Sequence, residues 1–398
     1  MPVRADSPSR EAHLARTCLV TGSLLPETGG PLRSIGAFQR ALDASVVSFV
    51  ERRDLPRYAL ALPPSRLALV ASRRLLGGGH FVLPERRALQ SARRLTDAAD
   101  LLSCHSFYLF HPAWVEAISR QRGTPYWLVP HGILDPYVNR RNHAVKQLYM
   151  SVVGRRCLAN AAATVFSTRN ERDKAIQTGL VANPVVINWP VDVPAAFDRD
   201  TARAALRSRL RIPPETKLLL YLGRLSPMKR PLETIRFFAA ATDKSWHMLL
   251  VGYPDGVSQG SCRLEAASSG VADRLHVIPG LPAAAVQAVI QGCDLFISYS
   301  CRENFNNAAA ECLGNGLPTL MSAGNDLVAD IGPSPAVGRL PESSAEAVST
   351  LKTWATMSGD ERFDRGRAGR EWVEANLSFE MFRERLQELR RETVNLHA

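Results

Sequence analysis

Short apolar runs alternate with longer amphipathic stretches along the whole chain, which is typical of parallel α/β proteins. In the first half, runs of strand length lie at residues 17–21, 45–50, 100–104, 126–129, 163–167 and 184–188, and a helical pattern covers 32–42. In the second half, strands are predicted at 217–222, 247–251, 275–278, 294–300 and 317–322, with helical patterns at 231–242, 282–291 and 306–313. This regular order predicts doubly wound sheets.

A charged, proline-containing stretch at residues 192–215 divides the two patterns, and we expect the domain linker there. We therefore predict one Rossmann-like domain over residues 1–190 and a second over residues 191–375. Residues 376–398 are predicted to form a C-terminal helix that packs back toward the first domain. Two such domains joined by a linker leave a central cleft, which is the usual place for a ligand.

Composition and length exclude several protein classes. At 398 residues the chain is too long for one compact core, and 45% apolar residues are enough to build two. No apolar run approaches the roughly 18 residues of a membrane-spanning helix. Residues 1–16 lack the apolar core of a signal peptide. The seven cysteines are scattered without CxxC spacing, which argues against a disulfide framework or a zinc site and favours a cytoplasmic protein.

The excess positive charge is confined to the first half. Residues 1–190 hold 25 Lys and Arg against 13 Asp and Glu, whereas the remainder holds 24 against 25, so that the net charges are +12 and −1. A basic half attracts nucleic acid, anionic lipid or phosphorylated substrates. Because there is no RRM-like aromatic signature, zinc finger or long lysine run, we expect no nucleic-acid partner. A solvated basic surface without any partner is the alternative.

The first group of candidate binding residues follows the predicted strand 217–222, in the sequence GRLSPMKRP. Ligands bind at the carboxyl ends of strands in doubly wound sheets. Arg224 and Lys229, five residues apart on one loop, can converge on a diphosphate, because arginine offers a fork of donors and lysine a point charge. An ordinary solvated basic turn explains this loop equally well when it is taken alone.

The second group of candidate residues follows the predicted strand 294–300. Glu303 lies before a helix that Asn306 or Asn307 can cap, and Glu311 lies in its second turn. Free backbone amides at the start of a helix favour a phosphate. The flanking carboxylates can accept hydrogen bonds from vicinal hydroxyl groups, such as those of a sugar and of a ribose. A surface helix with two unrelated acidic residues is the alternative.

Together, these segments resemble the family 4 retaining glycosyltransferases, which have the GT-B fold. The resemblance covers nearly the whole chain and rests on ETGGPLRS after the first strand, LVPHGILDP, GRLSPMKRP, and the spacing from Glu303 to Glu311, all in this order. It implies an α/β protein with two doubly wound Rossmann-like domains facing a central cleft. It also implies a retaining, metal-independent hexosyltransferase that moves a sugar from a nucleotide-diphosphate sugar to a glycan or lipid-linked acceptor in polysaccharide biosynthesis. No cofactor and no metal are expected.

The resemblance assigns roles to individual residues, with the acceptor in the first domain and the donor in the second. Arg224 and Lys229 would neutralise the donor diphosphate. Glu311 would hold the ribose hydroxyls, Glu303 would engage the transferred sugar, and His131 would reach the reacting sugar from the first domain. The implied catalytic set is therefore His131, Arg224, Lys229 and Glu303. The other implied donor-binding residues are Gly29, Gly30, Gly280, Leu281, Asn304, Phe305, Asn306 and Asn307.

Two positions depart from the family pattern. Family members usually carry glycine where Asn306 stands, and often Pro-Asn-Gly where this chain has Asn188-Trp189-Pro190. The first departure is expected to narrow the donor site, and the second alters the domain hinge. Both leave room for two alternatives to a transferase: a nucleotide-sugar epimerase of the same fold, and a non-catalytic nucleotide-sugar-binding scaffold.

Ten arginines of the first half lie within 43 positions of one another: Arg52, Arg53, Arg57, Arg66, Arg73, Arg74, Arg86, Arg87, Arg93 and Arg94. Apolar pieces at residues 58–62 and 67–70 lie between them. Such a surface suits peripheral attachment to the inner face of the cell membrane, where each cation contributes ~1 kcal/mol near anionic lipid. We therefore predict a cytoplasmic protein with a peripheral contact to an anionic membrane. Solvated helix faces with Asp and Glu partners from the same protein are the alternative.

Overall fold

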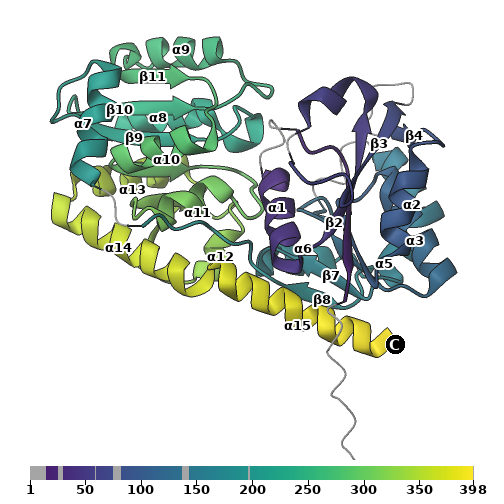
Figure 1. Cartoon of the computed structure of the whole chain (residues 1–398). Helices are drawn as coiled ribbons and strands as arrows, with labels where there is room; N and C mark the ends of the chain where they lie inside the picture. Colours follow the sequence, from purple (N-terminus) through teal and green to yellow (C-terminus); the bar gives the residue numbers. More distant parts are fainter. Residues whose placement is uncertain are drawn as a thin grey trace, which may run out of the picture. The chain divides into compact units, whose positions relative to one another are not determined.

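The computed structural model describes residues 15–25, 30–58, 60–74, 82–136, 143–195 and 198–397. They form two compact units, each with a sheet flanked by helices (Figure 1). Unit 1 contains the described residues up to Val165, Thr178–Val185, and those from Arg383 onward. Unit 2 contains Phe166–Gln177 and Val186–Phe382. The prediction of two Rossmann-like α/β domains is confirmed.

The larger sheet has eight strands in the order β4-β3-β2-β1-β5-β6-β7-β8. Their bounds are Thr17–Thr21 (β1), Ser45–Glu51 (β2), Leu67–Arg74 (β3), Val82–Pro84 (β4), Leu101–His105 (β5), Tyr126–Val129 (β6), Ala163–Phe166 (β7) and Pro184–Val186 (β8). The central strand β1 pairs in parallel with β2 and β5, whereas β4 runs antiparallel to β3 at the edge. The helices before β8 are α1 (Gly30–Leu42), α2 (Leu89–Asp97), α3 (Phe110–Arg122), α4 (His143–Tyr149), the π-helical turn η4 (Met150–Gly154), α5 (Arg155–Ala159) and α6 (Arg169–Ile176).

The smaller sheet, in unit 2, has six parallel strands in the order β11-β10-β9-β12-β13-β14. Their bounds are Lys217–Leu222 (β9), Trp246–Val251 (β10), Leu275–Ile278 (β11), Leu295–Ser298 (β12), Thr319–Ser322 (β13) and Val337–Leu340 (β14). The chain builds outward from β9 in one direction and then returns to build outward from β12 in the other. The boundary between β9 and β12 is therefore the topological switch point, where doubly wound sheets bind ligands.

The helices of the second half cover this sheet and lead to the C-terminus. They are α7 (Arg199–Leu210), α8 (Pro231–Ala241), α9 (Gln259–Ser268), α10 (Ala283–Gly292), α11 (Asn307–Gly314), α12 (Leu327–Ile331), α13 (Ser344–Thr356), α14 (Gly359–Asn376) and α15 (Phe379–His397). The last part of α15, drawn in yellow in Figure 1, belongs to unit 1. There Thr393 accepts a hydrogen bond from the indole of Trp127 at 2.9 Å, and Arg390 donates to the carbonyls of Ala15 and Leu42.

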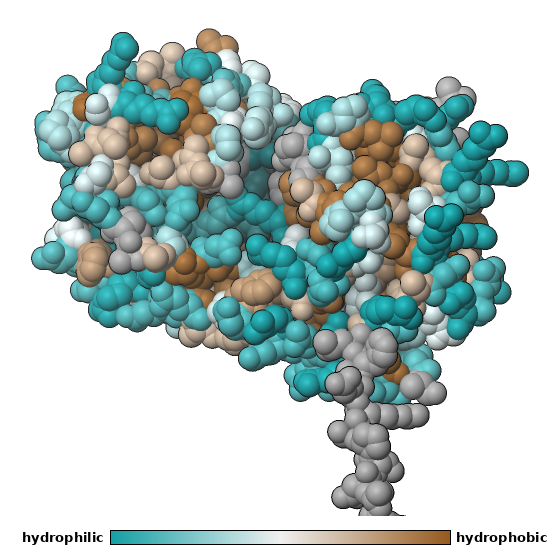
Figure 2. All heavy atoms as spheres, in the orientation of Figure 1, coloured by the Kyte–Doolittle hydropathy of each residue, from teal (hydrophilic) through white to brown (hydrophobic). Residues whose placement is uncertain are grey.

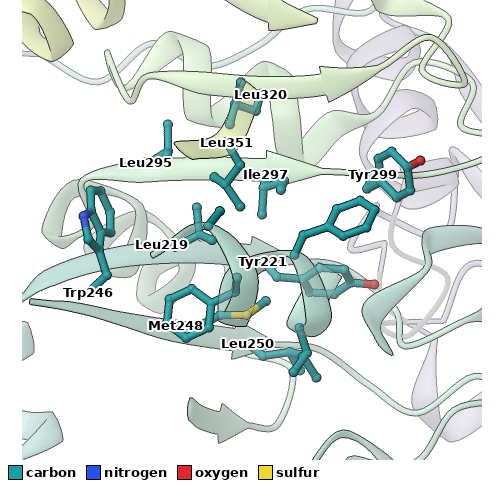
Figure 3. Close-up of a cluster of buried hydrophobic side chains, with 14 of the residues drawn as sticks. Leu219, Tyr221, Trp246, Met248, Leu250, Leu295, Ile297, Tyr299, Leu320 and Leu351 are labelled. Atoms are coloured by element: carbon teal, nitrogen blue, oxygen red, sulfur yellow. The ribbon is translucent and has the colours of Figure 1, made fainter. Parts of the chain in front are cut away.

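Figure 3 shows the apolar core cluster on one face of the smaller sheet, where alternate side chains of the strands pack against α8, α9 and α13. Leu218, Leu219 and Leu220 of β9 are successive residues and all are fully buried. A strand that helices cover on both faces has consecutive apolar residues, not alternating apolar and polar ones. For this reason the apolar runs of the second half predicted the bounds of β9 and β11 correctly.

The structure corrects the sequence analysis of the basic stretch in the first half. The apolar piece at 67–70 is not part of a surface, since it opens the sheet strand β3, in which Ala68 and Val70 are buried. Strands β3, β4 and β14 were not predicted. The edge strands β4 and β14 are not continuous apolar runs, because β4 ends in Pro84 and β14 contains Gly338 and Arg339. The glycine-rich segment 77–79 lies outside the described residues.

Hydrophilic residues cover most of the face shown in Figure 2, with small apolar patches between them. In the part of the chain that the structure describes, no helix has the length and apolarity needed to cross a bilayer. All seven cysteines are free thiols, and six of them are buried.

A buried ionic network fixes α7 to the sheet of unit 2. The carboxylate of Asp294, only 2% exposed, pairs with Arg203 and lies 2.6 Å from a guanidinium nitrogen of Arg207. It also accepts a hydrogen bond from the backbone of Leu218 at 2.8 Å. Arg207 donates in addition to the carbonyls of Thr216 and Gly292. The buried Arg207 therefore has a counter-charge and further hydrogen-bond acceptors, as burial demands.

We expect Asp294→Ala to lower the free energy of unfolding by ~3–5 kcal/mol, because it leaves the buried Arg207 without a counter-charge. Urea unfolding followed by tryptophan fluorescence measures the change. Asp364→Ala, which removes an exposed partner of Arg367 on α14, is the matched control and should leave stability unchanged. Equal effects of the two substitutions would contradict the structural role of the network.

Candidate functional site

The loops after β9 and β10 meet at the carboxyl edge of the smaller sheet because glycines stand where they touch. A side chain at Gly252 would place its Cβ 1.9 Å from the carbonyl oxygen of Gly223, so only glycine fits there. Gly223 itself has φ 152°, and the side chain of Lys229 packs over it. The loop therefore returns on itself and brings Lys229 back to the end of β9.

An ion pair joins this loop to the loop after β12. The ammonium group of Lys229 contacts the carboxylate of Glu303, and their side chains are 14% and 21% exposed. The backbone of Glu303 is fixed on both sides, since its N–H donates to Gly324 at 2.7 Å and its carbonyl accepts from Asp326 at 2.9 Å. The structure thus brings together two of the predicted residues, 74 positions apart in the sequence, at the switch point.

Arg224 lies on the same loop as Lys229 but is more exposed. Its guanidinium donates to the carboxylate of Asp255 at 2.7 Å, and the two side chains are 56% and 45% exposed. An exposed pair of this kind contributes little to stability and exchanges partners readily. Arg224 can therefore leave Asp255 for a bound anion.

Asn306 caps the start of α11, and its backbone conformation explains why asparagine occurs at this position. Its φ of 54° lies in the left-handed region, which glycine adopts freely and asparagine better than most other residues. The side chain is 4% exposed; it caps Ala309 N–H and donates to Ser298 and, at 2.5 Å, to the fully buried Asn325. The side chain therefore turns inward, which argues against the expectation that Asn306 narrows the donor site.

The other predicted residues of this segment lie around the start of α11. Phe305 is buried, and Asn304 has a buried side-chain oxygen without a hydrogen-bond partner among the described residues. Asn307 is the first residue of α11, and Glu311 follows one turn later, partly buried. The segment therefore offers a helix start flanked by the carboxylates of Glu303 and Glu311.

Gly280 and Leu281, predicted to frame a nucleotide base, follow β11. The ring of Tyr253 lies directly against Gly280, where a Cβ would be 2.0 Å from a ring carbon. Tyr253 is 50% exposed, so its ring offers an aromatic face at this edge of the sheet.

The sequence analysis missed Tyr253, Asp255 and Asn325. Tyr253 and Asp255 follow the end of β10, and the strand-end rule that selected Arg224 could have found them.

His131, in unit 1, is partly buried and forms a group with the buried histidines His105 and His111. It follows β6 with φ 53°, and its Nε2 lies 3.0 Å from Nδ1 of His105, whose other ring nitrogen is 3.1 Å from the hydroxyl of Ser103. Nε2 of His111 is 2.6 Å from the carbonyl of His105. Burial lowers the pKa of His131 and of His111 to about 4, and that of His105 well below its usual value.

Of the two glycines predicted to bind the donor in the first half, Gly30 is the first residue of α1 and Gly29 lies outside the described residues. Among the residues that the structure describes, no three His, Cys, Asp or Glu side chains converge as a metal site would require.

Two family models match most of the chain. Residues 202–348 match the model of the group 1 glycosyl transferases, and residues 12–189 match the glycosyl transferase 4-like domain. The chain belongs to the family 4, group 1 glycosyltransferases. The first match contains the loops after β9, β10, β11 and β12, and the second contains His131.

Among characterised relatives of this glycosyltransferase, the D-inositol 3-phosphate glycosyltransferase of Salinispora arenicola is 31% identical over 144 residues, 34% of this chain and 32% of the relative. The GDP-mannose:cellobiosyl-diphosphopolyprenol alpha-mannosyltransferase of Xanthomonas campestris is 24% identical over 229 residues, 56% of each chain. The matched region thus spans between a third and just over half of these relatives.

Solved structures show the GT-B fold over nearly the whole chain. Sucrose-phosphate synthase from Thermosynechococcus elongatus superimposes with a TM-score of 0.71 at 17% identity, covering 95% of this chain and 99% of that one. Anabaena HepE in complex with UDP and glucose gives a TM-score of 0.69 at 14% identity, covering 94% and 99%. At these identities the likeness establishes the fold alone.

We expect Asn306→Gly to lower the free energy of unfolding by ~1–3 kcal/mol, because Asn325 loses its donor and α11 its cap, while the affinity for nucleotide is unchanged. Asn306→Ala should cost ~1 kcal/mol more, since alanine is strained at positive φ. Thermal unfolding and nucleotide titration measure the two quantities, with Asn376→Ala on α14 as an exposed control. Unchanged stability together with tighter nucleotide binding in Asn306→Gly would show that the side chain does obstruct the site.

The buried histidines should make the stability of unit 1 depend on pH. The unfolded chain protonates its histidines near pH 6.5, whereas the folded chain keeps His111 and His131 neutral down to about pH 4. Their stabilising contribution is complete above pH 6.5 and is lost toward pH 4, at ~1.4 kcal/mol per pH unit for each histidine. We expect the free energy of unfolding to fall as the pH is lowered from 6.5 to 4. In His111→Gln, unfolding should take up about one proton fewer, so the free energy of unfolding should depend less steeply on pH.

Denaturant titrations at several pH values measure this slope, which is independent of any constant loss of stability in the variant. His143→Gln, on the exposed side of α4, serves as the control and should keep the wild-type slope. Identical slopes in all three proteins would rule out the histidine group as the source of acid sensitivity.

Proposed function

We propose that the protein is a retaining glycosyltransferase that moves a sugar from a nucleotide-diphosphate sugar to a glycan or lipid-linked acceptor in polysaccharide biosynthesis. The observation that carries the proposal is the pairing of Lys229 with Glu303 beside the start of α11, at the switch point of a doubly wound sheet. One cation, one carboxylate and the positive end of a helix at this place suit a diphosphate bound next to a sugar.

The proposed roles follow from the charges. Lys229 and Arg224 neutralise the diphosphate, and Glu311 accepts hydrogen bonds from the ribose hydroxyls. When the diphosphate binds Lys229, the carboxylate of Glu303 is released to accept hydrogen bonds from the transferred sugar. Gly280, Leu281 and the ring of Tyr253 face the base. His131 and Gly30, which belong to unit 1, keep their predicted roles toward the sugar and the donor phosphate.

The proposed reaction is a substitution on one face of the sugar. The bond between the anomeric carbon and the diphosphate oxygen breaks through an oxocarbenium-like state. The acceptor oxygen forms its bond on the same face, and the acceptor proton passes to the departing diphosphate. Cationic side chains and helix amides stabilise the negative charge of the leaving group, which is a large term in such reactions.

The relatives support a nucleotide-sugar donor and a lipid-linked acceptor. The Xanthomonas relative is named for GDP-mannose and a diphosphopolyprenol acceptor, and the Anabaena structure contains UDP. The inward position of Asn306 removes the specific argument for a non-catalytic scaffold, because its side chain serves helix capping and a buried hydrogen-bond network.

Binding of UDP and GDP, measured by calorimetry, tests the second-half site. We expect Lys229→Ala to weaken binding of the matching nucleotide by tenfold or more, since a hydrogen bond to a charged group contributes ~1.5–3 kcal/mol. Glu311→Gln should weaken it as well. Glu303→Gln should preserve or improve it, because Lys229 is freed from its carboxylate partner, although sugar transfer is lost.

Lys352→Ala, on the exposed face of α13, is the control and should bind nucleotide like the wild type. Unchanged affinity in both Lys229→Ala and Glu311→Gln would overturn the assignment of this site.

Incubation with the matching nucleotide sugar tests the reaction class. We expect release of nucleoside diphosphate that acceptor accelerates, a product with the donor's anomeric configuration by NMR, and full activity in excess EDTA. The protein supplies the cationic charge on the leaving group, so chelation should not matter. Loss of activity in EDTA with recovery on adding Mg²⁺ or Mn²⁺ would show that this charge assignment is wrong, and conversion of the sugar without acceptor would indicate an epimerase.

A further inference from the structure

A chain of hydrogen bonds leads from the core of unit 1 to His131. The hydroxyl of Ser103 lies 3.1 Å from Nε2 of His105, and Nδ1 of His105 lies 3.0 Å from Nε2 of His131. Ser103 and His105 are fully buried, whereas His131 is partly exposed. The chain of hydrogen bonds therefore begins inside the sheet and ends on the residue that the proposed function places beside the sugar.

The order of the strands brings these three residues together. Ser103 and His105 are two positions apart on β5, so their side chains leave the strand on the same face. His131 follows β6, which pairs with β5. His105 is the last residue of β5, and β5 lies beside β1, where the order of the larger sheet reverses. The group is therefore at the switch point of this sheet, where doubly wound sheets bind ligands.

The ring of His105 is fixed by its packing. The ring of Phe38, a fully buried residue of α1, lies edge-on to it, with centres 4.9 Å apart and planes at 88°. The backbone carbonyl of His105 accepts a hydrogen bond from Nε2 of His111 at 2.6 Å. A close-packed interior allows such a side chain one orientation, so Nδ1 of His105 keeps its direction toward His131.

Ser103 determines which nitrogen of His105 carries the proton. Among the described residues, Nε2 of His105 is the one hydrogen-bond partner of the buried Ser103 hydroxyl. A buried hydroxyl without an acceptor is costly, so Ser103 donates to Nε2, and the proton of neutral His105 is on Nδ1. That N–H donates to Nε2 of His131. Neutral His131 consequently carries its own proton on Nδ1.

The low basicity of both rings supports this assignment. Burial lowers the pKa of His131 to about 4 and holds the pKa of His105 well below its usual value. Both rings are therefore neutral at physiological pH. Neutrality matters because a protonated histidine has two donors and no acceptor nitrogen, so that it could not accept a hydrogen bond from its neighbour.

The backbone around this group is strained. Ser106, Tyr108 and His131 have φ of 78°, 54° and 53°, a region that is unfavourable for residues other than glycine. They are three of the eight such residues in the described part of the chain. Residues of this kind collect at ligand sites, where the surrounding contacts hold them in place. The conformation of His131 is therefore imposed by its surroundings, which include the ring of His105.

We propose that Ser103 and His105 are positioning residues that present His131 to the transferred sugar in one orientation and as the tautomer protonated on Nδ1. His131 then acts toward a sugar hydroxyl as a hydrogen-bond donor and not as a base. The aspartate of a serine protease triad likewise holds a histidine in the required tautomer. The inference rests on the proposed function, which gives His131 a sugar to contact.

Heteronuclear NMR of the full-length protein labelled with ¹⁵N-histidine tests the tautomer, with His131→Gln to assign the signals. We expect wild-type His131 to be protonated on Nδ1. His105→Phe keeps a ring against Phe38 but has no nitrogen, so His131 should shift toward the Nε2-protonated form that histidine prefers in water. His105→Asn, whose amide can donate from the place of Nδ1, should keep the wild-type tautomer.

Kinetics of sugar transfer test the consequence. We expect His105→Phe to lower kcat by about tenfold or more, as the loss of partners that orient functional histidines does. His105→Asn should recover most of the wild-type value, and Ser103→Ala, which removes a single hydroxyl, should lower kcat less than His105→Phe. The affinity for nucleoside diphosphate should stay unchanged in all three variants, because the residues proposed to bind it belong to unit 2.

A second pair of histidines provides a matched control. Nδ1 of His247 lies 3.0 Å from Nε2 of His276, near the amino ends of β10 and β11 and away from the carboxyl edge of the sheet. His247→Phe removes the same kind of hydrogen bond and should leave kcat unchanged. Thermal unfolding and the stoichiometry of nucleotide binding measure how much of each variant is folded.

Three results would refute the proposal: wild-type His131 protonated on Nε2, wild-type kcat in folded His105→Phe, or equal losses of kcat in His105→Phe and His247→Phe. A wild-type protein that transfers no sugar from any nucleotide sugar would instead contradict the proposed function. The NMR comparison would then still decide whether Ser103 and His105 fix the tautomer of His131.

Discussion

The ion pair between Lys229 and Glu303 ties together the two loops on either side of the switch point in the six-stranded sheet. Both groups are largely withdrawn from water, so each needs a partner in the unliganded protein. The sheet order makes the contact available, since β9 and β12 are neighbours although more than 70 residues separate them. The glycines at 223 and 252 let the loops approach, and the backbone bonds of Glu303 to the loop after β13 hold the carboxylate in place.

The ion pair between Lys229 and Glu303 explains how one site can bind a ligand that carries both a diphosphate and sugar hydroxyl groups. A diphosphate competes for Lys229 with its multiple anionic oxygens, and a carboxylate released from that pair becomes a hydrogen-bond acceptor for hydroxyl groups. Asn306 supports the site without facing a ligand. Its side chain points into the protein, where it caps α11 and hydrogen-bonds to Asn325. The exposed ring of Tyr253 against Gly280 adds an aromatic surface at the end where a base would lie.

Sequence patterns located most strands, because buried parallel strands are continuous apolar runs that end in loops. β1, β6, β9 and β11 were located to the residue, and the strand-end rule selected Arg224, Lys229 and Glu303. The contact between Lys229 and Glu303 could not be derived in this way, since it depends on which strands are neighbours. Sequence patterns predicted that Asn306 or Asn307 caps α11, and Asn306 does. The inward direction of its side chain could not be predicted, because it depends on the positive φ and on Asn325, which is distant in the sequence. The ion pairs of the arginine-rich stretch depend on carboxylates such as Glu85, which sheet pairing brings near.

A crystal structure of the protein with its matching nucleoside diphosphate tests the central claim most directly. The account predicts density for the diphosphate at the carboxyl edge between β9 and β12, with the ammonium group of Lys229 moved from Glu303 to a phosphate oxygen and the ribose hydroxyls on Glu311. A nucleotide bound elsewhere in the protein, or bound here with the pair of Lys229 and Glu303 intact, would contradict it.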